Sequence, residues 1–210
     1  IRYFFYIGGN DSMDTVAKLS EYTKGHEYEM RIIGVPKTID NDLVGTDHTP
    51  GFPSAAKYIA VTMQEIIRDC AVYTTKAVTI VEIMGRDSGW LTTASAIGRV
   101  VNGVAPDYVY LPERTFSMEQ FFSDVRAALA KHPNVVIAVS EGVRFADGRY
   151  VCEGIGVEST DAFGHKQLSG TGKALELAVR AELGCKVRSV ELNISQRCAA
   201  HIASATDIAE

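Results

Sequence analysis

Short apolar runs alternate with longer segments of helical periodicity along the chain, and this alternation limits the folds that it can adopt. The apolar runs predict strands at residues 1–7, 30–35, 77–83, 107–111, 135–140 and 187–192. The segments between and after them predict helices at residues 11–22, 51–71, 88–98, 117–131, 170–183 and 197–205. This order predicts an α/β fold with a mainly parallel sheet and helices on both of its faces.

The first run, IRYFFYI, is apolar and aromatic almost throughout, which predicts a buried strand. Residues 144–165 are rich in glycine and aperiodic, which predicts a long loop or hairpin.

Composition and charge argue against several classes of function. The chain has 210 residues, enough for one domain with a sizeable core or for one domain and part of another. Its net charge of −5 argues against a basic surface for nucleic acid. No apolar run approaches the ~20 residues that cross a bilayer, and no signal segment opens the chain, so we expect a cytoplasmic protein that binds no membrane. The four cysteines are widely spaced, which predicts free thiols.

Polar clusters follow four of the predicted strands. They occupy residues 8–12, 37–42, 84–86 and 140–142. In parallel α/β sheets, ligands bind beyond the carboxyl ends of the strands. Four clusters at that edge therefore predict one binding site.

The first cluster, Gly8-Gly9-Asn10-Asp11-Ser12, connects a predicted strand to a predicted helix. Its glycines would let the backbone approach a ligand, and the start of the helix would offer N–H groups to a phosphate. Glycine-rich turns are common, and this one has neither GxGxxG nor GxxxxGKS/T spacing. A tight turn with Asp11 or Ser12 as the helix cap is the alternative.

The second cluster, Lys37-Thr38-Ile39-Asp40-Asn41-Asp42, places two carboxylates two residues apart, near a lysine and a hydroxyl. This set suits a site that removes a proton from an alcohol and holds a metal ion beside phosphates. By composition alone, an Asx-rich surface turn is the simpler interpretation. The position of the cluster in a long loop, directly after a strand, favours a functional site.

In this order, the motifs resemble the active-site segments of the phosphofructokinase family. PKTIDND at residues 36–42, followed by GTDHTPGF at residues 45–52, is similar to the central segment of that family. EIMGR at residues 82–86 and SEG at residues 140–142 are similar to two further motifs, and the turn at residues 8–12 resembles the phosphate loop. The resemblance runs along the whole chain. It implies a phosphofructokinase-like fold, with a donor-binding region and catalytic loop at residues 1–70 and a sugar-phosphate-binding region at residues 71–210.

The resemblance implies transfer of a phosphoryl group to the 1-hydroxyl of fructose 6-phosphate. Asp40 is then the expected general base, and Thr38 and Arg86 are the other expected catalytic residues. The expected contacts of the sugar phosphate are Thr38, Asp40, Met84, Gly85, Arg86, Glu141, Arg188 and Arg197. Such sites form between subunits, which implies a homodimer or homotetramer in which Arg188 serves the neighbouring site.

The resemblance extends to the donor and the metal ion. The expected donor contacts are Gly9, Asp11, Ser12 and Lys37, and Mg²⁺ is expected at Asn10 and Asp42. ATP-dependent members have glycine at the position of Asp11 and a small residue at that of Lys37, so this pair resembles the pyrophosphate-dependent branch. An aspartate there would repel and crowd the α-phosphate of ATP, whereas the lysine would compensate the compact charge of pyrophosphate.

The chain departs from the family pattern in three respects. Asn10 stands where the family has a metal-binding aspartate, and Ile194 stands where many members have histidine or tyrosine near the sugar phosphate. The chain begins at Ile1 inside a predicted strand and ends in a helical stretch. We therefore expect an internal piece of a longer protein, without the family's first strand and C-terminal elements. Two alternatives stay open: an ATP-dependent phosphofructokinase or related kinase, and a non-catalytic, phosphofructokinase-like regulatory subunit.

Overall fold

The computed structural model of the protein describes residues 1–26, 28–155 and 170–209. The elements follow the order β1 (Tyr3–Gly8), α1 (Asn10–Gly25), β2 (Arg31–Pro36), α2 (Phe52–Ala71), β3 (Ala77–Ile83), α3 (Trp90–Ala94), α4 (Gly98–Val101), β4 (Tyr108–Tyr110), α5 (Met118–Leu129), β5 (Asn134–Ser140), η1 (Val151–Ile155), α6 (Thr171–Leu183), β6 (Lys186–Glu191), α7 (Ser195–Cys198), η2 (Ala200–Ile202) and α8 (Ala205–Ala209).

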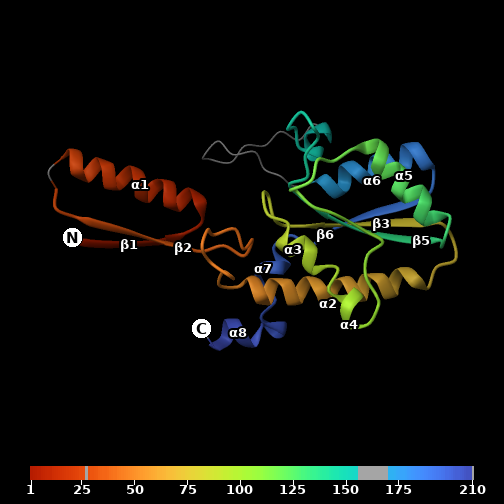
Figure 1. Ribbon diagram of the computed structural model, residues 1–210, viewed down its shortest axis with the longest axis horizontal. Coiled ribbons are helices and arrows are strands. Elements are labelled where there is room, and N and C mark those ends of the chain that lie inside the picture. The colour runs from red at the N-terminus through yellow and green to blue at the C-terminus, as the bar shows by residue number, and fades with distance from the viewer. Residues whose placement is uncertain (27, 156–169, 210) are drawn as a thin grey trace.

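The strands of the described residues form two parallel sheets rather than one. β1 pairs with β2, and a separate sheet has the order β4-β5-β3-β6. Figure 1 shows two units side by side: the smaller unit is β1–α1–β2, and the larger unit comprises the four-stranded sheet and the helices from α2 onward. The loop after β2 joins the two units. The prediction of a parallel α/β fold is confirmed, although its strands are divided between two sheets.

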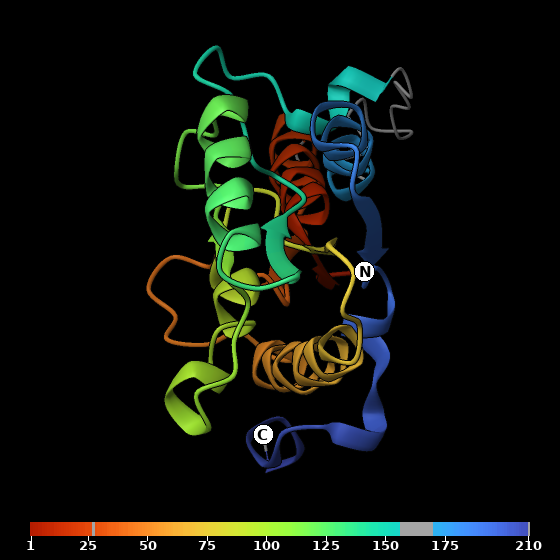
Figure 2. The ribbon, with the colours of Figure 1, turned by 90° about the vertical axis from the view of Figure 1, so that its right-hand side faces the viewer.

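Helices cover both faces of the four-stranded sheet, as predicted. Along β3, Val78 and Ile80 pack into a core with α5 and α6, whereas Val81 and Ile83 pack into a second core with α2 and α3. Successive side chains of a strand point to opposite faces, so one strand supplies both cores. Figures 1 and 2 show α5 and α6 on one side of this sheet and α2 on the other. Because α2 packs on this sheet, the structural division falls in the loop before α2; the functional division at residue 70 stays a prediction.

The predicted burial of the first strand is wrong for this chain. Tyr3, Phe5 and Ile7 of β1 are each about 60% exposed or more. Within the described residues, β1 pairs with β2 alone, and α1 covers one face of this pair, where Met13 packs against Gly34. The opposite face of the strand carries the exposed apolar side chains.

Two predicted helices are interrupted. The segment predicted at residues 88–98 divides into α3 and α4, where the Ser95 hydroxyl donates to the carbonyl of Thr92 at 2.6 Å. The segment predicted at residues 197–205 divides into α7, η2 and α8, because the backbone leaves the helical region at Ala199 and Ala203. This last segment follows the surface of α2, where Lys57 donates to the carbonyl of Ala203 at 3.2 Å. Tertiary contacts here outweigh helix propensity.

Three further predictions can be compared with the structure. In the predicted loop at residues 144–165, Arg144 and Tyr150 form an isolated antiparallel bridge and η1 follows; residues 156–165 lie outside the described residues. All four cysteines are free, as predicted. None of the helices in the described ranges is both long and apolar enough to span a bilayer.

Candidate active site

A cavity of about 410 Å³ lies where the two sheets meet, and all four polar clusters contribute to it. Its lining residues are Gly9, Asn10, Asp11, Asp14, Lys37, Thr38, Ile39, Asp40, Asp42, Pro50, Met84, Arg86, Asp87, Glu141 and Arg197. The first two clusters follow β1 and β2, and the other two follow β3 and β5. The structure therefore brings together the carboxyl ends of strands from two sheets, which explains how clusters far apart in the sequence reach one site.

The loop between β2 and α2 carries Asp40 and is held by its own side chains. The backbone N–H of Asp40 donates to the Thr38 hydroxyl at 3.0 Å. Asn41 is buried and has a φ of 59°, a left-handed conformation that asparagine tolerates better than most residues. Its side-chain oxygen accepts from the N–H of Thr49 at 2.9 Å, and its amide nitrogen donates to the carbonyl of Asp47 at 3.3 Å. Asn41 thus closes the loop on itself between the two carboxylates of the second cluster.

Asp40 lies in an environment that suits a general base. Burial and the neighbouring charge of Asp42 raise the pKa of Asp40 to about 6, although Arg86 and Arg197 act in the opposite direction. A base is most effective when its pKa lies near the pH at which it works. The same surroundings therefore keep Asp40 able to accept a proton and provide two guanidinium groups nearby for anionic groups of a substrate.

Glu141 and Glu82 are two further carboxyl groups with a raised pKa. Burial raises the pKa of Glu141 to about 7, even though the N–H of Gly85 donates to it at 3.2 Å. Burial likewise raises the pKa of Glu82 to about 7, although its oxygens accept from the N–H groups of Gly170 at 3.2 Å and Gly172 at 2.6 Å. Glu141 lines the cavity, whereas Glu82 binds the start of α6.

Glycines allow the close contacts behind the third and fourth clusters. Gly85 has a φ of 128°, and a β-carbon there would lie 2.3 Å from the carbonyl oxygen of Ser88. A β-carbon at Gly142 would lie 1.7 Å from the carbonyl oxygen of Arg86. The Ser140 hydroxyl donates to the carbonyl of Gly85 at 2.6 Å, which connects the two clusters. Only glycine fits at these two positions. The MGR motif (residues 84–86) and the SEG motif (residues 140–142) therefore pack directly against each other.

The turn at residues 8–12 forms the opposite wall of the cavity. The N–H of Ser12 donates to the carbonyl of Gly9 at 3.0 Å as α1 begins, and the N–H of Lys37 donates to the carbonyl of Gly8 at 2.9 Å. These bonds place Lys37 beside the start of α1, where N–H groups and the helix dipole favour an anion. Ser12 is not among the residues that line the cavity.

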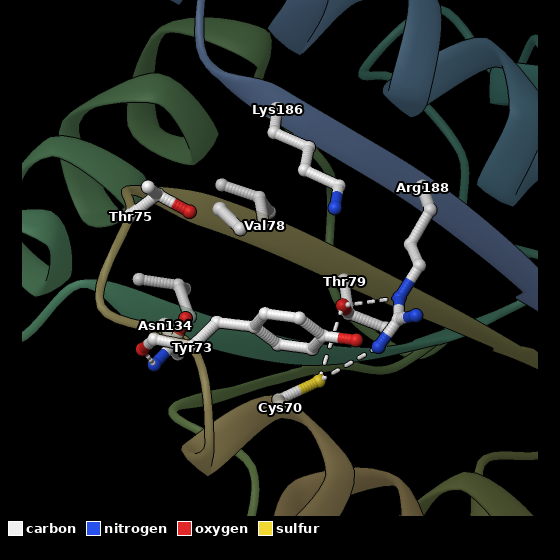
Figure 3. A pocket seen from close by; sticks show the side chains of 10 residues that line it. Cys70, Tyr73, Thr75, Val78, Thr79, Asn134, Lys186 and Arg188 are labelled. Atoms are coloured by element: carbon white, nitrogen blue, oxygen red, sulfur yellow. Dashed lines mark hydrogen bonds between the residues drawn. The ribbon is translucent and has the colours of Figure 1, made fainter.

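Arg188 lies away from the cavity in this chain. It pairs in register with Thr79, the third residue of β3, and so lies toward the amino ends of the strands. Its guanidinium donates to the Thr79 hydroxyl at 3.1 Å, to Asp69 at 2.7 Å and to the Cys70 sulfur at 3.3 Å. Figure 3 shows this group with Tyr73 and Lys186 around a separate pocket. The role of Arg188 in the site of a second copy stays a prediction.

Several residues of the site were not predicted from the sequence. Asp14 and Asp87 both line the cavity. Asp14 follows Asn10 by one helical turn, a spacing that places both on one face of α1, and Asp87 directly follows Arg86. The sequence positions of these two aspartates could therefore have indicated that they belong to the site. The sequence near Gln196 gives no such indication; this residue is 2% exposed, and its side-chain oxygen accepts from the N–H of Met84 at 3.3 Å.

The side-chain oxygens at the cavity are compatible with Mg²⁺. Asn10, Asp14 and Asp42 offer an amide oxygen and two carboxylates along its wall. Within the described part of the chain, no three histidine, cysteine, aspartate or glutamate side chains are close enough to hold a metal ion by themselves. Mg²⁺ commonly uses one or two carboxylates together with phosphate oxygens of a substrate, and this donor set fits that mode.

Comparison with known proteins agrees with the fold and shows the family. The family model "Phosphofructokinase" matches residues 1–192. Pyrophosphate--fructose 6-phosphate 1-phosphotransferase of Xanthomonas campestris pv. campestris (strain B100) is 44% identical over 209 residues, which are 99% of this chain and 50% of that protein. The protein of the same name from Rhodospirillum rubrum is 45% identical over 202 residues, covering 94% of this chain and 50% of that protein. The crystal structure of a pyrophosphate-dependent phosphofructokinase from Marinobacter aquaeolei matches with a TM-score of 0.75 and 36% identity, over 100% of this chain and 48% of that one. The chain thus spans about half the length of these relatives.

Proposed function

The chain belongs to the phosphofructokinase family, and we propose that its site transfers a phosphoryl group from pyrophosphate to the 1-hydroxyl of fructose 6-phosphate. The products are fructose 1,6-bisphosphate and phosphate. The observation that carries the proposal is the cavity in which Asp40, two arginines and Lys37 converge. The names and the identity of the pyrophosphate-dependent relatives support the choice of donor and acceptor.

In the proposed reaction, Asp40 accepts the proton of the 1-hydroxyl of the sugar. The oxygen of this hydroxyl attacks a phosphorus atom of pyrophosphate at the same time. The new oxygen–phosphorus bond forms as the bond to the leaving phosphate breaks. Phosphoryl transfer depends mainly on positioning and on neutralising charge. Arg86 and Lys37 offset the negative charge of the transferred group, and Thr38 contacts that group and the sugar.

The sugar phosphate occupies the side of the cavity formed by the larger unit. Arg197 binds the 6-phosphate, for which a guanidinium offers paired donors. Glu141 accepts hydrogen bonds from sugar hydroxyls, and Met84 and Gly85 border the sugar. We extend the proposal to Arg188, which serves the site of a second copy in a homodimer or homotetramer.

Pyrophosphate occupies the side of the cavity formed by the turn at residues 8–12. Gly9, Asp11, Ser12 and Lys37 are its proposed contacts. Asp11 disfavours ATP, because its charge would repel the α-phosphate, while Lys37 attracts the compact anion. Asn10 and Asp42 would hold Mg²⁺, with Asp14 nearby, and the ion when bound supplies positive charge to the phosphate oxygens. The proposed compartment of this reaction is the cytoplasm.

The test compares donors and removes the base. The full protein is assayed for fructose 1,6-bisphosphate with fructose 6-phosphate and either pyrophosphate or ATP. Asp40→Asn is expected to lower turnover by about 10²–10⁴-fold, because proton removal is lost, while calorimetry still detects fructose 6-phosphate binding. Preference for ATP would contradict the proposed donor, and equal loss of binding and turnover would contradict the role of Asp40. A wild-type protein that binds the sugar phosphate without turnover would favour the regulatory alternative.

A further inference from the structure

The first turn of α2 is capped by a side chain from the far end of the chain. Its N-cap residue, Gly51, has a φ of 87°, and no side chain within the turn caps it. Instead, the carboxylate of Asp207 in α8 accepts from the N–H of Gly51 at 2.8 Å and from the N–H of Ser54 at 2.7 Å, and it also accepts from the Ser54 hydroxyl. The first N–H groups of a helix need partners outside the helix, and a negative charge there is favourable.

This cap belongs to a larger connection between the last segment of the chain and α2. The N–H of Ser204 donates to the Ser54 hydroxyl at 2.8 Å, and Lys57 donates to the carbonyl of Ala203 at 3.2 Å. Burial opposes the charged form of Asp207, but the hydrogen bonds from Ser54 and Gly51 hold its pKa below the usual value. Asp207 therefore acts as a charged cap.

The capped turn is also the end of the loop that carries Asp40. The backbone of Gly51 lies so close to Ile39 that a β-carbon on the glycine would come within 3.3 Å of the Ile39 side chain. Ile39 directly precedes Asp40. A shift of the first turn of α2 would thus change the contact between Gly51 and Ile39, the residue next to the proposed base.

A hollow of about 240 Å³ lies behind this part of the loop. Ile39, Gly51 and Ser54 line it together with Arg197 and Ala203. Close packing therefore does not fill the space between the loop and the last segment. Because well-packed contacts hold a backbone and voids do not, the hydrogen bonds of Asp207 constrain this end of the loop from the side of the hollow, in addition to the bond between Asn41 and Thr49.

We propose that Asp207 is a positioning residue for the catalytic loop: it fixes the first turn of α2 and thereby the approach of Asp40 to the acceptor hydroxyl. The inference rests on the proposed function of Asp40. A displacement of about 1 Å in a reacting group is enough to lower turnover by up to about 10²-fold. The effect of Asp207 is therefore expected in turnover rather than in substrate affinity.

The test uses Asp207→Ala and Asp207→Asn in the full protein. Asp207→Ala is expected to lower kcat by tenfold or more, with the KM values for fructose 6-phosphate and pyrophosphate changed by less than about threefold. Asp207→Asn keeps one acceptor oxygen and is expected to recover part of kcat. Hydrogen exchange of the backbone at residues 38–54 is expected to rise in the alanine variant.

The matched control is Asp107→Ala. Asp107 also accepts from a backbone N–H, that of Val136 at 2.9 Å, and contacts His132 at 2.8 Å, but it does not line the cavity. This control is expected to lower the melting temperature without changing kcat. If Asp207→Ala does the same, with unchanged exchange in the loop, Asp207 is merely structural and the inference is wrong. If the wild-type protein shows no phosphotransferase activity but Asp207→Ala still raises exchange at residues 38–54, the proposed reaction fails while the control of the loop by Asp207 stands.

Discussion

The side-chain hydroxyl of Ser88 donates a hydrogen bond to the backbone carbonyl oxygen of Asp40 at 2.9 Å. Ser88 follows β3 in the larger unit, whereas Asp40 follows β2 in the smaller one. Ser88 is buried, so this bond is shielded from water. It connects the loop of the proposed base to the MGR motif, Met84-Gly85-Arg86, which we propose borders the acceptor sugar.

Ser88→Ala is expected to lower both stability and turnover. Loss of the hydroxyl leaves a carbonyl without this donor and costs about 1 kcal/mol of the free energy of unfolding. Since the loop is then less constrained, kcat is expected to fall roughly tenfold with little change in KM. The control is Ser95→Ala, which removes a buried hydroxyl whose bond to the carbonyl of Thr92 is local to α3. Equal kcat values for the two variants would contradict a positioning role for Ser88.

The pH dependence of the reaction is expected to report Asp40. A base must be unprotonated, and the pKa of Asp40 is raised to about 6. In the direction that consumes pyrophosphate, kcat/KM is therefore expected to fall as the pH drops through about 6, and to level off above it. In Asp40→Asn, the residual activity should lose this acid limb. An unchanged limb in that variant would assign it to another group, such as Glu141, whose pKa is raised to about 7.

Replacement of Asp11 by glycine is expected to change the donor preference. Asp11→Gly removes the charge that would repel the α-phosphate of ATP, so kcat/KM for ATP relative to pyrophosphate should rise by about tenfold or more. Lys37→Ala should lower kcat/KM for pyrophosphate, because the compact anion loses its cation. Glu21→Gln, at an exposed position of α1, is the control for a change of charge on the same helix. A donor ratio that is unchanged in Asp11→Gly would show that Asp11 does not determine the donor.

Glu82 is expected to make the protein less stable as the pH rises. Burial raises its pKa from 4.5 to about 7 in the folded state. Between these values the folded protein binds more protons than the unfolded chain, so the free energy of unfolding decreases with rising pH, by a total on the order of 3 kcal/mol. Glu82→Gln should reduce this slope whatever its effect on absolute stability. Denaturant unfolding at pH 5 and pH 8 measures the slope, and Glu119→Gln, at an exposed site on α5, should leave it unchanged.

Much of the fold and of the proposed site could be predicted because the signals are local. Apolar runs gave strands close to the observed β3 and β5, and polar clusters at the ends of four strands predicted residues that share one cavity. Helices whose shape depends on distant contacts were predicted less well. The last predicted helix divides into three short pieces along α2.

The sequence by itself determined the order of strands and helices, the glycines of the MGR and SEG motifs, and the proximity of Asp40 to Asp42 along one loop. Only the tertiary structure decided that two sheets, not one, supply the cavity, that Arg188 lies away from it, and that Asp207 caps α2 from 153 residues beyond Ser54. The physical reason is the range of the interactions. Periodicity and steric limits act between neighbours in the sequence, whereas the burial of a carboxylate and the partner of a free N–H depend on segments that meet only after the chain has folded.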